Sequence, residues 1–263
     1  MVVAGQSVIE ASIGKVERFE QTGSSTVVAA GWDFRAVISF DSDPGDPVTI
    51  SSPTTGPFSL GPDPIDPDGR AGTFSFATKA DLDANFPASE TYTFGYGSSS
   101  TYALGLGADD YPALATPPEF TAATFAAAQA INPTRPFEIE FLSKDFALFD
   151  FIGITYTDGG TRFPIDVVPD TDTQYTIDAG ELPASSNLTI NISYSKITGT
   201  GPGASDASGY TLETSLPTVT LVPEPSRAGW LLGTAALVAT VLRRRPHRTR
   251  EVGPQGGPEG CQE

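Results

Sequence analysis

Leu188-Thr189-Ile190-Asn191-Ile192-Ser193-Tyr194, LTINISY, alternates apolar and polar residues without a break. Successive side chains of a β-strand point to opposite faces, so Leu188, Ile190 and Ile192 share one face and the polar residues share the other. This period of two predicts a half-buried strand.

Comparable strand signals recur along the chain, separated by turn sequences such as DPGD, DPDG and TDGG. The segments are 26–30, 34–40, 48–51, 72–76, 91–96, 137–141, 149–156, 174–177 and 188–194. Gly 27 and Pro 23 fit a chain with many turns. Short strands at this spacing favour an all-β fold, which we expect to be an antiparallel β-sandwich.

Helix signals are few before the C-terminal region. Residues 79–85 can form a short helix with Thr78 as N-cap, because a threonine hydroxyl accepts from a free backbone N–H of the first turn. The alanine-rich stretch 122–130 is ambiguous between helix and loop.

A weak internal repeat suggests how the strands are divided into domains. Residues 87–94, PASETYTF, align with 183–190, PASSNLTI, without a gap, and GPFSL at 56–60 can correspond to TRFPI at 161–165. The repeat favours two Ig-like sandwich modules, at 1–105 and 125–221, with 106–124 as the connection. One sandwich with two related halves is the alternative.

Charge and composition exclude several classes of function. The net charge is −17, with 28 acidic and 9 basic residues before Pro223, so we expect no binding to nucleic acid. The single histidine and the single cysteine are His247 and Cys261. Residues 1–221 therefore offer no histidine metal ligand, no cysteine nucleophile and no Ser-His-Asp triad, and we expect a protein that is not an enzyme.

An apolar run of fifteen residues, AGWLLGTAALVATVL at 228–242, stands out near the C-terminus. As a helix it would extend about 22 Å, somewhat less than the hydrocarbon core of a bilayer, which is roughly 30 Å thick. Arg243, Arg244 and Arg245 follow directly. Basic residues beside a span stay in the cytoplasm, so we expect a transmembrane helix at 228–242 with the body outside and a disordered tail, 246–263, inside.

Val222, Pro223, Glu224, Pro225 and Ser226 precede this run. The order VPEPS, apolar helix, arginine cluster resembles the PEP-CTERM sorting signal of bacterial surface and secreted proteins, here at 222–245. The resemblance implies recognition by exosortase, a membrane-embedded peptidase, and cutting near Pro225. It implies that the Pro-Glu-Pro residues are substrate residues rather than catalytic ones.

Two features depart from the usual pattern of such signals. The tail 246–263 extends beyond the arginines, and the first residues lack the basic and apolar regions of a signal peptide. Val2-Val3-Ala4 before Gly5 looks like the end of a signal peptide, so we expect the true start to lie upstream.

The loop 63–69 concentrates acidic side chains. Asp63, Asp66 and Asp68 supply carboxylate oxygens, which Ca²⁺ prefers, although their spacing is not that of an EF-hand. Two further clusters are Asp41, Asp43, Asp46 and Asp166, Asp170, Asp172. Because aspartate is common in turns, each cluster can also be purely structural. Calcium at 63–68 is the one cofactor that we consider.

Together these observations predict an exported envelope or extracellular-matrix protein with a structural or adhesive role, with exopolysaccharide as a candidate partner. A carbohydrate-binding module is the alternative. An extracellular hydrolase is a more distant one, because no carboxylate pair stands out among the acids.

Overall fold

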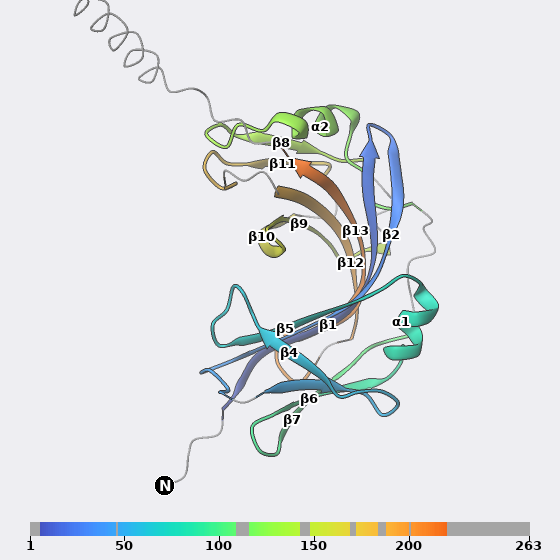
Figure 1. Ribbon diagram of the computed structural model, residues 1–263, viewed down its shortest axis with the longest axis vertical. Coiled ribbons are helices and arrows are strands. Elements are labelled where there is room, and N and C mark those ends of the chain that lie inside the picture. Colours follow the sequence, from blue (N-terminus) through green and yellow to red (C-terminus); the bar gives the residue numbers. More distant parts are fainter. Residues whose placement is uncertain are drawn as a thin grey trace, which may run out of the picture. The chain divides into compact units, whose positions relative to one another are not determined.

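The computed structural model describes residues 6–45, 47–108, 116–142, 148–168, 172–183, 188–199 and 201–219 (Figure 1). Most of these residues form strands. The strands are β1 Val8–Gly23, β2 Thr26–Phe40, β3 Val48–Ser51, β4 Phe58–Pro62, β5 Gly69–Phe76, β6 Thr91–Tyr96, β7 Ser100–Gly105, β8 Phe137–Glu140, β9 Phe151–Asp158, β10 Thr161–Val168, β11 Gln174–Ile177, β12 Leu188–Gly199 and β13 Ala207–Val219. The helical elements are α1 Lys79–Asn85, α2 Ala122–Ala127 and the 3₁₀ turn η1 Ala128–Ala130. The prediction of an all-β fold is confirmed.

Eleven strands form one sheet in the order β10-β9-β12-β13-β1-β2-β5-β4-β3-β6-β7, and β11 pairs with β8 separately. The β1 and β13 strands run parallel, in a register that places Arg18 opposite Glu213. The other described pairings are antiparallel. A purely antiparallel arrangement is therefore wrong at the centre of the sheet, and the sandwich of two Ig-like modules is not confirmed.

Two hydrophobic cores lie along this one sheet, and β1 and β13 carry residues that pack in both. Figure 1 shows the long strands β1, β2, β12 and β13 running together through the middle of the sheet. The first core consists mainly of residues from the first half of the chain, including Ile13, Phe34, Ile38, Tyr92, Phe94 and Tyr210. The second includes Phe120, Ile139, Ile152, Ile190, Ile192 and Leu212. All of these strands belong to one compact unit, and the module boundaries at 105 and 125 stay a prediction.

The alternation that predicted β12 is present in the structure. Leu188, Ile190 and Ile192 have no exposed surface and lie in the second core. Asn191 and Ser193, on the opposite face, are also buried. This second burial was not expected, because a half-buried strand normally turns its polar face to solvent.

The predicted helix cap is confirmed. Thr78 precedes α1, and its hydroxyl accepts a hydrogen bond from the backbone N–H of Asp81 at 3.1 Å. The ambiguous stretch 122–130 is helical, as α2 followed by η1, and Thr121 caps it in the same way.

The repeated segments lead into strands with different neighbours. The first leads into β6, between β3 and β7, and the second into β12, between β9 and β13.

Within the described ranges no helix is long and apolar enough to cross a membrane. The apolar run at 228–242 lies outside these ranges.

Candidate functional site

The face of the long strands that points away from both cores carries small and polar side chains. On β2, Phe34, Ala36 and Ile38 enter the first core, so Asp33 and Arg35 are left on the other face. This other face borders a cavity of about 560 Å³. We call this cavity the hollow, and its lining includes Arg18, Asp33, Arg35, Arg162, Asn191 and Glu213.

Two turns border the hollow, one from each half of the chain. Asp63, Pro64 and Ile65 come from the β4–β5 turn, and Gly160, Arg162 and Pro164 come from the β9–β10 hairpin. Residues about a hundred positions apart in the sequence thus line one cavity.

Glu213 on β13 is the centre of an ion network in the hollow. Its side chain is 4% exposed and accepts from Arg35 Nη2 at 2.8 Å and Arg35 Nη1 at 2.9 Å. Arg162 on β10 also contacts Glu213 through its Nη1 atom. One carboxylate therefore binds two guanidinium groups, and one of these bonds is bidentate.

Asp33 extends the network across β2. It accepts from Ser75 at 2.8 Å and from Arg35 Nη2 at 3.2 Å. Arg18 Nε lies 3.0 Å from Asp33 Oδ1, without the alignment of a hydrogen bond. The network thus contains three guanidinium groups and two buried carboxylates.

The network changes the acidity of its members. Burial alone would raise the pKa of Glu213, but the charges of Arg35 and Arg162 lower it to about 2. Burial alone would lower the pKa of Arg35, whereas the charges of Glu213 and Asp33 raise it. Burial lowers the pKa of Arg162 despite the attraction of Glu213. Glu213 is therefore ionised at neutral pH.

Neutral hydrogen-bonding groups lie beside the network. Asn191 donates from Nδ2 to Thr157 at 3.1 Å and to Thr155 at 3.3 Å, and its Oδ1 accepts from Ser215 at 2.7 Å. These contacts explain why the polar face of β12 is buried: its partners are other polar side chains of the same sheet face.

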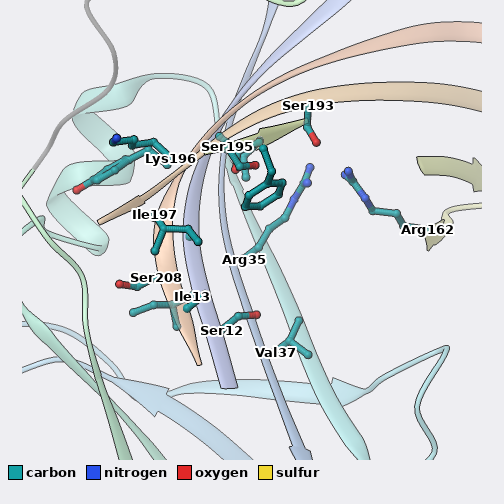
Figure 2. Close-up of a pocket in the computed structure, with 17 residues that line it drawn as sticks. Ser12, Ile13, Arg35, Val37, Arg162, Ser193, Ser195, Lys196, Ile197 and Ser208 are labelled. Atoms are coloured by element: carbon teal, nitrogen blue, oxygen red, sulfur yellow. The ribbon is translucent and has the colours of Figure 1, made fainter. Parts of the chain in front are cut away.

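A smaller cavity of about 240 Å³ shares Arg35, Val37 and Arg162 with the hollow. Figure 2 shows the guanidinium groups of Arg35 and Arg162 pointing toward each other near Ser193. The side chain of Lys196 points away from them, and its Nζ lies 3.6 Å from Asp150. The cationic groups that face this cavity are therefore the two arginines.

Close backbone contact shapes this part of the sheet. A side chain on Gly209 of β13 would collide with the carbonyl oxygen of Lys196 on β12. Glycine is thus required where these two strands approach each other beside the smaller cavity.

The candidate calcium ligands lie in the β4–β5 turn. Asp63 Oδ1 accepts the backbone N–H groups of Ile65 and Asp66, and Asp66 Oδ1 accepts that of Asp68. These contacts are those of aspartates that shape a turn. Within the part of the chain that the structure describes, no group of three or more His, Cys, Asp or Glu side chains is placed to hold a metal ion. Calcium binding at Asp63, Asp66 and Asp68 stays a prediction.

Val222, Pro223, Glu224, Pro225 and Ser226 lie outside the described residues, as do Arg243, Arg244 and Arg245.

Sequence reasoning did not find the network. Its members come from β1, β2, β10 and β13, and only the fold brings them together. One signal was present: in WDFRAVISF at 32–40, Asp33 and Arg35 flank Phe34 and occupy the polar face of an otherwise apolar strand.

Comparison with known proteins gives little further information. The sequence matches no protein-family model and no curated protein. A solved structure from work on the host-cell-surface retention of a 1.5-MDa bacterial ice-binding adhesin is 14% identical, with a TM-score of 0.26. The match covers 82% of this chain and 65% of that one. Such a superposition is too loose to support a shared fold or function.

Proposed function

We propose that this chain is an exported, non-catalytic protein of the bacterial surface or extracellular matrix, sorted through its C-terminus and acting as an adhesive or structural element. The observation that carries the proposal is the order of VPEPS, apolar run and three arginines at 222–245. On this proposal an exosortase-type peptidase cuts near Pro225, and the body is transferred or released outside the cell.

The position of the last strand supports this processing. β13 ends at Val219, three residues before Val222. A cut at 223–225 would therefore leave every described strand in the body, and the product would need nothing from the removed segment to keep its sheet.

The acids of the hollow support a non-catalytic role. A general acid needs a pKa near the working pH. Glu213, with a pKa of about 2, is ionised and held by two arginines, and Asp33 is bound by Arg35 and Ser75. Glu213 is therefore not available to donate a proton to a glycosidic oxygen.

A carbohydrate-binding module is the second candidate. The hollow favours it, because a cavity of about 560 Å³ lined by hydroxyl, amide and guanidinium groups has the size and the hydrogen-bonding capacity for a sugar unit.

Expression with a secretion signal supplied, in a host with an active exosortase, tests the proposal. The intact mass of the mature protein should show loss of everything beyond the 223–225 region. Glu224→Ala should leave full-length protein in the membrane, whereas Asp68→Ala, in the β4–β5 turn, should be processed like wild type. Equal cutting of wild type and Glu224→Ala would refute the sorting signal, as would the absence of any cutting while the same exosortase processes another substrate.

A further inference from the structure

Three arginines line the hollow of this strongly acidic chain, together with three acids among the described residues. The net charge is −17, yet Arg18, Arg35 and Arg162 all line the hollow. Two of the three lining acids, Asp33 and Glu213, are buried in the network. The third, Asp63, lies in the β4–β5 turn, where one of its oxygens accepts two backbone N–H groups. Within the network the guanidinium groups outnumber the carboxylates.

Arg162 has hydrogen-bonding capacity left over. A guanidinium group carries five N–H donors, and among the described residues Glu213 is the acid that Arg162 contacts. Its side chain is 33% exposed and lines both cavities. Arg35, by contrast, is held by two bonds to Glu213 and one to Asp33. Arg18 and Arg162 therefore keep donors for a further anion, and Arg162 is the one on β10, opposite the threonine-bearing strand β9.

Hydroxyl and amide groups lie close to Arg162. Thr157 is directly opposite Arg162 in the β9–β10 pairing, and Thr157 is opposite Thr189 in the next pairing. Asn191 lies beside them, bonded to Thr157. None of the described residues that line the hollow is aromatic, so they would hold a ligand by charge and hydrogen bonds rather than by stacking.

We propose that the hollow binds a carboxylate-bearing sugar unit, such as the uronic acid of an acidic polysaccharide, with its carboxylate on Arg162 and its hydroxyls toward Thr157 and Thr189. This inference rests on the proposed adhesive role, since it names the class of matrix component that the body would bind. Arginine suits this task because its planar donors match a carboxylate in pairs.

The test uses the full chain, isotopically labelled and purified in mild detergent because of the apolar run at 228–242. Sodium glucuronate is titrated while backbone amide shifts are recorded by NMR, with glucose as the matched neutral sugar and acetate as a carboxylate without hydroxyls. Glucuronate should bind with shifts centred on Thr157 and Thr189, and the two controls should bind about tenfold more weakly or worse.

Three variants connect the binding to Arg162. Arg162→Gln should weaken glucuronate binding by about tenfold or more. Arg162→Lys keeps the charge but not the planar pair of donors, so its affinity should lie between those of wild type and Arg162→Gln. Arg135→Gln removes an exposed arginine that does not line the hollow and should bind like wild type. Circular dichroism of each variant establishes whether it is folded. If Arg162→Gln does not fold, Arg162→Lys tests the role of Arg162 in its place.

Several outcomes would overturn the inference. These are an absence of shifts with glucuronate, equal binding of glucose or acetate, shifts located away from the hollow, or unchanged affinity when Arg162 is replaced. None of them alters the mass of the processed protein, so failure of this site is distinguishable from failure of the sorting proposal.

Discussion

Lys15 has no exposed surface, and its ammonium group lies 2.5 Å from Asp83 Oδ1. Lys15 comes from the middle of β1 and Asp83 from α1, which packs beside the first core. Burial alone would raise the pKa of Asp83, but its hydrogen bonds with Lys15 and Lys79 lower it. A short helix thus supplies the counter-charge for a lysine inside the sheet.

Replacing Asp83 by Asn should destabilise the protein by about 3 kcal/mol, because it leaves the buried ammonium group of Lys15 without its charge partner. Urea unfolding measures the loss. Lys79→Ala is the matched control: it removes the partly exposed cation from the same carboxylate and should cost about 1 kcal/mol or less. Equal losses for the two variants would contradict the assignment.

The stability of the ion network should depend on acid pH. The pKa of Glu213 is about 2 in the folded protein, below its ordinary value of 4.5, so its contribution is present above pH 4.5 and disappears as the pH falls through 2. This difference corresponds to about 3 kcal/mol. Glu213→Gln should be less stable than wild type by about that amount at pH 6, and the two should converge near pH 2.

The control for this measurement is Glu138→Gln, an exposed acid on β8. Its unfolding curves should follow those of wild type at each pH. If the difference in stability between wild type and Glu213→Gln stayed constant from pH 6 to pH 2, the carboxylate charge would not be what stabilises the network.

The cap of α1 gives a smaller effect. Thr78→Ala removes the acceptor of the Asp81 N–H and should cost about 1 kcal/mol, whereas Thr78→Ser keeps the hydroxyl and should cost much less. Thermal unfolding of the two variants, measured side by side, distinguishes loss of the cap from loss of the threonine methyl group.

The orientation of the C-terminus can be tested with alkaline phosphatase, which is active only outside the cytoplasm. With a secretion signal supplied, a fusion after Glu263 should be inactive, because Arg243 to Arg245 keep the tail inside. A fusion after Leu221 should be active. Activity of the Glu263 fusion would refute the orientation.

Sequence pattern predicted local structure where one rule dominated. The alternation at 188–194 identified β12, and Thr78 identified the start of α1. The period of two also predicted which face of β12 enters a core. It could not tell what covers the other face, because Asn191 and Ser193 are buried by groups from β9 and β13.

The first strand shows why the ion pairs and the pairing of distant strands were not predicted. β1 contains Glu10, Lys15, Glu17, Arg18 and Glu20, charges that obscure any apolar period. In the fold Lys15 pairs with Asp83 on one face and Arg18 with Asp33 on the other. A central strand can carry such charges only if residues far away in the sequence supply oppositely charged partners. The local sequence carries no information about those partners. The continuous eleven-stranded sheet was not predicted for the same reason.

The parallel contact of β1 with β13 joins the first described strand of the chain to the last. The paired residues, from Ser12 with Ala207 to Glu20 with Ser215, are about two hundred positions apart in the sequence. Contacts between residues so far apart form slowly. During synthesis, β1 can pair with β2 early, but its other edge stays open until residues 207–219 have left the ribosome. The middle of the sheet is therefore completed by the last described strand to emerge, and a chain that stops short of Ala207 would leave β1 as an exposed edge, open to pairing with other chains.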